Sequence, residues 1–498
     1  MSNPQLEARI LAANQQLADG EYQAALDVYT QLILAGVERA DVYNNRGNAR
    51  YALGDLKAAI GDYTVAIRLN PRVDYGHFNR GNCRLQLEDF EAAIRDYDRA
   101  IQFEPRHAVA FFRKGKALFQ LGQPEAALES YQAGLAVAEE VEGWAGLAEA
   151  QEAMGQIEKA LESWQKIEKL HPQTPDLHRN MAELLWRLGQ AKEALQQIRK
   201  AIQQDTADET APGLLAMWLE ELGEYPASLE AYEQWLERGE DQAAPWYGKG
   251  RVLWANGQKE AAVAAWEKVL TIEADHVPAL YQLGAWAFEQ QDYALTIDYM
   301  SRLLEKERDH AQAYLLRGKA RRRSGENFPA LTDFEMALSK DGALWESLEW
   351  RGEIFLEIKR FEEAIRAFTS VLKQQADHIN SLNGRGRAYG ALEKWPQASQ
   401  DFERVVSLAP NFLGGRFNLV KTLLEIGDAE KALPSAQWLT EHFPKDPRAS
   451  LTAAQVFWQV RDVAKAMQWG QVAQQHGHPE APAFLTLLER IQAQSNKS

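Results

Sequence analysis

Residues 46–71 read RGNARYALGDLKAAIGDYTVAIRLNP, and residues 80–105 read RGNCRLQLEDFEAAIRDYDRAIQFEP. The two stretches begin 34 residues apart and share the first glycine, three alanines, two aspartates and the final proline. A fixed period of this length indicates an array of small supersecondary elements that stack on one another. Extending the register in both directions gives fourteen repeats, with one residue missing before Val141, starting at residues 6, 40, 74, 108, 141, 175, 209, 243, 277, 311, 345, 379, 413 and 447.

Each repeat follows one pattern when positions are counted from its first residue. Position 8 is Gly or Ala in thirteen repeats, position 15 is Gly in nine, position 20 is Ala in twelve and position 24 is aromatic in ten. Apolar residues at three- and four-residue steps on both sides of position 15 predict two amphipathic helices, and Gly between them allows the positive φ of a helix C-cap. Small residues at positions 8 and 20 predict a close helix crossing, as at Gly47 with Ala59 and at Gly81 with Ala93.

This pattern resembles the tetratricopeptide repeat over residues 6–480. The resemblance implies an all-α fold, a right-handed superhelical α-solenoid of antiparallel helix pairs whose first helices line a concave groove. The four repeats of residues 6–140 are nearest to the family pattern, and the ten repeats of residues 141–480 continue from them. The short fourth repeat predicts a seam near residues 138–143, and residues 481–492 predict a capping helix.

Composition excludes several classes of function. A net charge of −16 argues against a general nucleic-acid binder, which needs a basic face to displace counterions. The single cysteine, Cys83, allows neither an internal disulfide nor a cysteine zinc site, and His276, His310 and His378 share position 34, which indicates turn residues rather than metal ligands. No glycine-rich phosphate loop, nucleophile elbow or membrane-length apolar run is present, so we assign no catalytic, cofactor-binding or metal residue and expect a cytoplasmic protein.

Position 7 is cationic in seven repeats, as in Arg46 and Arg80. Asp occurs at position 23 in four repeats, as in Asp62 and Asp96, and all four have Arg at position 7. We therefore predict an Arg–Asp pair inside each of these repeats, although a ladder of cations is also a pattern for phosphate binding. The basic cluster at 317–323 has two similar interpretations, which are neutralisation by the glutamates of the next repeat and contact with an acidic partner.

Two groups of residues are candidates for partner binding. By resemblance to the family, Asn48, Asn79 and Arg113 match three of the five positions of the carboxylate clamp found in chaperone-binding members, whereas Asn44 and Val109 occupy its two lysine positions. The second group is aromatic, and its members are either anchors for a bound helix or peptide or packing residues within the array. This second group comprises Trp186, Tyr247, Trp254, Tyr281 and Phe288.

We expect a non-enzymatic scaffold or adaptor that binds peptide segments of partner proteins in its groove, for example during assembly of a complex. One alternative is a regulatory subunit that recruits substrates for a separate enzyme. A remote alternative is an RNA-binding helical repeat, against which the charge and the absence of a sustained basic groove both argue.

Overall fold

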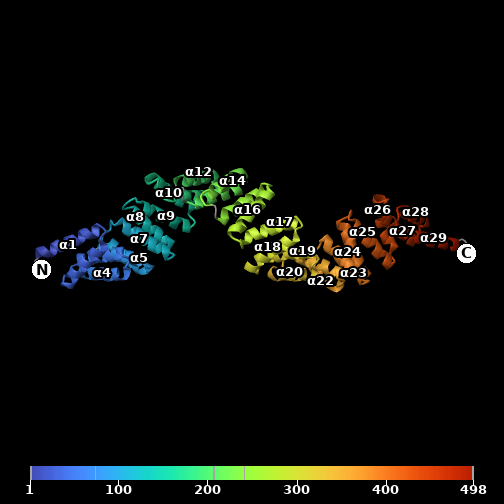
Figure 1. The fold of residues 1–498 in the computed structure, drawn as a ribbon, viewed down its shortest axis with the longest axis horizontal. Helices are drawn as coiled ribbons and strands as arrows, with labels where there is room; N and C mark the ends of the chain where they lie inside the picture. Colours follow the sequence, from blue (N-terminus) through green and yellow to red (C-terminus); the bar gives the residue numbers. More distant parts are fainter. Residues whose placement is uncertain (1–2, 73, 206–207, 240–241, 496–498) are drawn as a thin grey trace. The chain divides into compact units, whose positions relative to one another are not determined.

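The computed structural model describes residues 3–72, 74–205, 208–239 and 242–495, which form 29 α-helices and no strand. The predicted all-α repeat solenoid is therefore confirmed for this part of the chain. The helices belong to two compact units, Met1–Glu240 and Asp241–Ser498. Figure 1 shows successive helices folded back on one another along each unit. The predicted division into 6–140 and 141–480 stays a prediction.

Every repeat contributes a first and a second helix. The N-terminal unit has the first helices α1 (Asn3–Ala18), α3 (Ala40–Ala52), α5 (Asp74–Gln86), α7 (Ala108–Gln120), α9 (Val141–Ala153), α11 (Leu177–Arg187) and α13 (Thr210–Glu221). Its second helices are α2 (Tyr22–Leu34), α4 (Leu56–Leu69), α6 (Phe90–Phe103), α8 (Pro124–Leu135), α10 (Ile157–Leu170), α12 (Ala191–Gln204) and α14 (Tyr225–Leu236).

The C-terminal unit repeats this order. Its first helices are α15 (Ala243–Ala255), α17 (Val277–Glu289), α19 (Ala311–Arg323), α21 (Trp345–Glu357), α23 (Ile379–Ala391), α25 (Leu413–Ile426) and α27 (Pro447–Gln459). Its second helices are α16 (Lys259–Ile272), α18 (Tyr293–Lys306), α20 (Asn327–Lys340), α22 (Phe361–Gln374), α24 (Trp395–Leu408), α26 (Ala429–His442) and α28 (Val463–Gln475). The last helix, α29 (Ala481–Ser495), covers residues 481–492, and its role as a capping helix stays a prediction.

The helix crossing within a repeat depends on glycine at position 8. A Cβ atom added to Gly47 would lie 2.6 Å from Cε1 of Tyr63, and one added to Gly81 would lie 2.8 Å from Cε1 of Tyr97. Ala59 and Ala93, at position 20, are fully buried at the same crossings. The ring at position 24 therefore packs directly against the backbone at position 8, and it fits because position 8 has no larger side chain.

The turn at position 15 has one backbone conformation whichever residue occupies it. Gly54 and Gly122 have φ of +82° and +75°, as the C-cap prediction requires. Where glycine is missing the same left-handed conformation remains, with φ of 61° at Lys359 and 57° at Glu393. These side chains occupy a region that only glycine enters without a steric penalty.

Replacement of Lys359 by glycine is therefore expected to raise the free energy of unfolding by about 1 kcal/mol, since it removes the left-handed penalty. Gly122→Ala at the equivalent position should lower the free energy of unfolding by a similar amount, so it serves as the reverse control. Urea denaturation followed by circular dichroism measures both variants. A Lys359→Gly variant that is less stable than the wild type would show that the lysine side chain contributes more than the strain removes.

The short fourth repeat joins the fifth through an unusually close approach. α8 ends at Leu135 and α9 begins at Val141. Cβ atoms added to Gly143 and Gly146 would lie 2.4 Å from Phe112 Cε1 and 2.2 Å from Tyr131 Cζ, respectively. The missing residue in the linker thus coincides with two glycines that let α9 lie directly on the rings of α7 and α8.

Candidate functional site

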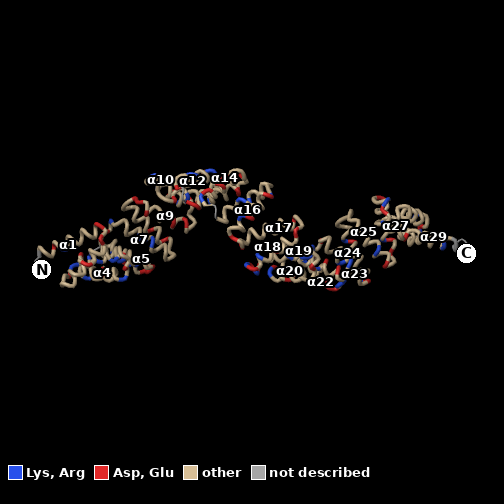
Figure 2. The backbone as a smooth tube through the Cα atoms, viewed as in Figure 1, with Lys and Arg blue, Asp and Glu red and all other residues tan. Residues whose placement is uncertain are grey.

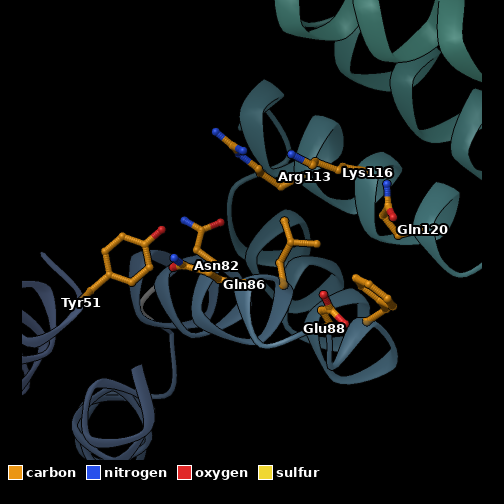
Figure 3. Close-up of a pocket in the computed structure, with 9 residues that line it drawn as sticks. Tyr51, Asn82, Gln86, Glu88, Arg113, Lys116 and Gln120 are labelled. Atoms are coloured by element: carbon orange, nitrogen blue, oxygen red, sulfur yellow. The ribbon is translucent and has the colours of Figure 1, made fainter. Parts of the chain in front are cut away.

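A hollow of about 370 Å3 lies against the first helices of the second, third and fourth repeats. Figure 3 shows Asn82 and Gln86 of α5 between Tyr51 of α3 and the α7 side chains Arg113 and Lys116. These five side chains belong to first helices, which line the concave groove in the family resemblance. The lining residues are Tyr51, Asn82, Leu85, Gln86, Glu88, Phe90, Arg113, Lys116 and Gln120.

Asparagines at position 9 are oriented by tyrosines at position 24. The hydroxyl of Tyr63 donates to Oδ1 of Asn48 at 2.8 Å, and the hydroxyl of Tyr97 donates to Oδ1 of Asn82 at 2.9 Å. Because each carbonyl oxygen is already an acceptor, each amide group has its NH2 available as a donor. Asn82 was not singled out from the sequence, although the pairing of Asn at position 9 with Tyr at position 24 was a signal that could have found it.

The clamp candidates have different roles in the structure. Nδ2 of Asn79 donates to Oδ1 of Asn48 at 3.1 Å and to Oδ1 of Asn44 at 3.2 Å. Asn48 and Asn79 are therefore brought together, but they form a hydrogen bond with each other between the second and third repeats. Arg113 lines the hollow, where its side chain is 37% exposed and its Nε lies 3.3 Å from Oε1 of Glu142. Of the three candidates, Arg113 is the one that reaches this hollow.

The charges around this hollow favour an anion. Arg113 and Lys116 are both cationic, and Lys116 is exposed, whereas Glu88 is the carboxylate among the lining residues. Farther along the array, burial raises the pKa of Glu149 in α9, while the charge of Lys116 opposes that rise. The cationic side chains of Arg113 and Lys116 and the amide groups of Asn82 and Gln86 therefore line the same hollow.

The predicted Arg–Asp pairs are present, and three of the four include a second arginine that was not predicted. Arg80 donates from Nε and Nη2 to the two carboxylate oxygens of Asp96, at 3.0 and 2.7 Å. Arg84, at position 11, donates to the same carboxylate at 2.7 Å, a partner that considering positions 7 and 23 alone missed. The equivalent bonds join Arg46 and Arg50 to Asp62, Arg317 and Arg321 to Asp333, and Arg385 to Asp401.

The cations at position 7 also join neighbouring repeats. Nη1 of Arg80 donates to Oγ1 of Thr64 in the preceding repeat at 3.0 Å. Arg317 reaches Ser301 and Arg385 reaches Thr369 in the same way. These contacts engage the arginines inside the stack, which favours the structural interpretation of the cation ladder over phosphate binding.

The basic cluster of α19 is neutralised partly by Asp333 of its own repeat, which pairs with Arg317 and Arg321, and partly by the next repeat. Nζ of Lys319 lies 2.5 Å from Oε2 of Glu346, and Arg322 pairs with Glu357. Figure 2 shows basic and acidic residues interleaved along the helices of each unit. Neutralisation across the stack, one of the two interpretations from the sequence, is therefore part of the arrangement in the structure.

The aromatic candidates are half-buried and touch other rings of the array. Trp186, in the N-terminal unit, stacks on Trp218 with ring centroids 4.8 Å apart. Trp254, in the C-terminal unit, lies 5.5 Å from Trp266, and Nζ of Lys259 lies 4.7 Å from its centroid. The remaining contacts pair Tyr247 with His276, Tyr281 with His310 and Phe288 with Tyr293. Packing accounts for part of each ring surface, and partner binding by these residues stays a prediction.

The position-34 histidines are helix caps. Nδ1 of His276 accepts from the backbone N–H of Ala279, and Nδ1 of His310 accepts from that of Ala313. Among the described residues, no group of three or more His, Cys, Asp or Glu side chains is arranged to hold a metal ion. Burial raises the pKa of the Cys83 thiol to about 12. No described helix has both the length and the apolar character needed to cross a bilayer.

Models of the tetratricopeptide repeat match most of the chain, at residues 10–74, 75–107, 108–140, 146–209, 214–278, 278–310 and 417–482. The DnaJ homolog subfamily C member 3 of Homo sapiens is 22% identical over 202 residues, which are 36% of this chain and 39% of that protein. The Hsp70-Hsp90 organizing protein 3 of Arabidopsis thaliana is 20% identical over 236 residues, which are 40% of this chain and 42% of that protein. The chain thus spans less than half the length of these relatives.

Solved structures with similar folds include the complex of Naa15/Naa10 bound to HypK-THB and the yeast Tom70. The first is 13% identical with a TM-score of 0.33, covering 99% of this chain and 97% of that chain. The second is 14% identical with a TM-score of 0.30, covering 91% of this chain and 99% of that chain.

Proposed function

The chain belongs to the tetratricopeptide repeat family, and from that premise we propose that it is a non-enzymatic adaptor that binds an acidic peptide segment of a partner protein. The proposed binding site is the hollow on α3, α5 and α7, which we call the N-terminal hollow. Such an adaptor brings proteins together and needs no chemistry of its own. We also propose a cytoplasmic location, which the single cysteine supports.

One observation carries the proposal, which is the convergence of Arg113, Lys116 and Asn82 on the N-terminal hollow. A carboxylate can accept charge-assisted hydrogen bonds from a guanidinium and an ammonium group, and these bonds are stronger than neutral ones. An amide such as that of Asn82 can donate to the backbone carbonyl of an extended peptide. An acidic peptide can accept from both kinds of donor, whereas a neutral peptide would leave Lys116 without a carboxylate from the ligand and Arg113 with Glu142 alone.

The net charge of −16 argues against a nucleic-acid partner, because a long phosphate backbone needs a continuous basic face, whereas a short acidic segment needs only a local pair of cations. Two of the relatives are named after DnaJ and after Hsp70 and Hsp90. We therefore propose chaperones as the first partner proteins to test.

The double variant Arg113→Ala/Lys116→Ala is expected to lower partner recovery at least tenfold, since each charged hydrogen bond is worth about 1.5 kcal/mol or more. The measurement is affinity capture from native lysate, with chemical cross-linking and mass spectrometry. The matched control is Arg95→Ala/Arg99→Ala, which removes the same charge from exposed positions on the second helix α6 of the third repeat. Equal losses in both variants, or cross-links confined to second helices, would contradict binding at the N-terminal hollow.

A further inference from the structure

A second hollow, of about 310 Å3, lies on α23 and α25 in the C-terminal unit, and we call it the C-terminal hollow. Its walls come from positions equivalent to those of the N-terminal hollow, including position 9 of one repeat and positions 6 and 9 of the next. The lining residues are Gly386, Arg387, Gly390, Ala391, Trp395, Phe402, Asn418, Lys421 and Thr422.

Gly390 opens the C-terminal hollow. It occupies position 12, where the other thirteen repeats carry a larger side chain, such as Tyr51, Leu85 or Leu356. Packing does not require the glycine, because an added Cβ would lie 3.6 Å from Cζ3 of Trp395, an ordinary contact distance. Its φ is not in the left-handed region either.

The neighbouring Gly386 makes the contrast clear, since an added Cβ there would lie 2.7 Å from Cε1 of Phe402. Gly386 is therefore needed for the helix crossing, like the other glycines at position 8. Glycine inside a helix is less stable than alanine, so Gly390 weakens α23 without a packing benefit. Its effect is to leave the half-buried ring of Trp395 facing an open space.

The charged groups at the C-terminal hollow are cations. Lys421 is exposed and forms no ion pair with any described residue. Arg387 is half exposed, and its Nη1 lies 3.7 Å from Oε2 of Glu353, which leaves other guanidinium donors available. Nδ2 of Asn418 donates to Oδ1 of Asn383 at 2.9 Å. Within the described part of the chain, no carboxylate lines this hollow.

We propose that the C-terminal hollow binds an aromatic side chain of an acidic partner segment. The incoming ring packs against Trp395 in the space above Gly390, because aromatic pairs favour offset or edge contacts. Carboxylates on either side of that ring pair with Lys421 and Arg387. This inference extends the proposed adaptor function by giving the chain a second peptide contact, which selects a ring as well as charge.

The test uses the full chain and a fluorescein-labelled, amidated peptide, Asp-Glu-Phe-Asp-Glu, with binding followed by fluorescence anisotropy at low salt. Gly390→Leu places a leucine side chain in the space beside Trp395, and Lys421→Glu reverses the charge. Each variant is expected to weaken binding at least tenfold when it is combined with Arg113→Ala/Lys116→Ala, so that the N-terminal hollow does not bind the probe. Gly390→Leu should keep or raise the melting temperature, because leucine favours a helix, so lost binding cannot be attributed to unfolding.

Three controls give every outcome a meaning. Lys373→Glu, at an exposed position of the second helix α22, carries the same charge change away from the hollow and should bind like the wild type. The peptides Asp-Glu-Ala-Asp-Glu and Asn-Gln-Phe-Asn-Gln lack the ring and the charges, respectively, and both should bind more weakly.

Unchanged affinity when Gly390→Leu is added to Arg113→Ala/Lys116→Ala, or absence of binding by the wild-type chain, would overturn the inference. Equal binding of the peptide without a ring would also overturn it, because charge alone would then explain recognition. Loss of binding in Arg113→Ala/Lys116→Ala with retention in Gly390→Leu would keep the proposed function and reject the C-terminal hollow. The reverse result would support this inference and contradict the N-terminal hollow as a site for acidic peptides.

Discussion

Asp96→Ala is expected to lower the free energy of unfolding by about 3 kcal/mol, because it removes the carboxylate shared by Arg80 and Arg84. Asp96 is 2% exposed, and the side chains of Arg80 and Arg84 are 14% and 24% exposed. Without the aspartate, two largely buried guanidinium groups lose their counter-charge at a helix crossing. Urea denaturation followed by circular dichroism, with the melting temperature as a second measure, gives the size of the loss.

The chain supplies a matched control in Asp401, which is also nearly fully buried. Among the described residues it accepts from Arg385 only, since Tyr389 stands where the other three repeats have a second arginine. Asp401→Ala therefore leaves one guanidinium unmatched and is expected to have about half the effect. Equal losses in the two variants would show that the second arginine contributes nothing, and no loss in either would contradict a structural role for the pairs.

The same carboxylate gives the wild type a pH dependence. Burial alone would raise the pKa of Asp96, but the nearby His77, whose Nδ1 lies 3.7 Å from Oδ1, the hydrogen bonds from Arg80 and the charges of Arg80 and Arg84 together lower it. A folded-state pKa below the unfolded value, which is about 3.9, stabilises the protein above that pH. This contribution is lost as the pH falls through the folded-state pKa. Unfolding curves between pH 5 and pH 2 should therefore show a smaller acid-induced loss for Asp96→Ala than for the wild type.

The repeat register could be read from the sequence because it depends on contacts within one repeat. Positions 8, 20 and 24 meet at each crossing, so their spacing carries the information. The position in the repeat determines the backbone conformation of the turn even where glycine is absent, since Lys359 and Glu393 keep a left-handed φ. The first helices consequently begin within three residues of the predicted repeat starts.

The candidate site was harder to predict because its contacts run between repeats. Asn79 matched a binding motif by position, yet its amide bonds Asn44 and Asn48 of the preceding repeat. Arg84 was missed for a different reason: it binds Asp96 within one repeat, but only positions 7 and 23 were compared and position 11 was not. Gly390 could have been noticed as the one glycine at position 12, but a missing side chain predicts a hollow only when the surrounding walls are known.

The junction between the fourth and fifth repeats is where a single methyl group should have a large effect. Gly146→Ala places a Cβ 2.2 Å from Cζ and 2.6 Å from the hydroxyl oxygen of Tyr131, a ring that is itself 4% exposed and cannot move into solvent. Overpacking of this kind costs about 2 kcal/mol. Alanine is about 1 kcal/mol better than glycine inside a helix, so a net loss requires the clash to exceed that gain.

Gly61→Ala separates these two terms. Gly61 is exposed in α4 and has no neighbouring atom within 4 Å of an added Cβ, so this variant should show only the helical gain, a rise of about 1 kcal/mol in the free energy of unfolding. Gly146→Ala should instead lower the free energy of unfolding, as measured by urea denaturation of both variants side by side. A rise in both would mean that Tyr131 yields to the new methyl group and that the short linker does not hold α9 against it. A loss confined to Gly146→Ala would show that the missing residue and the two glycines of α9 act together to close the array at this junction.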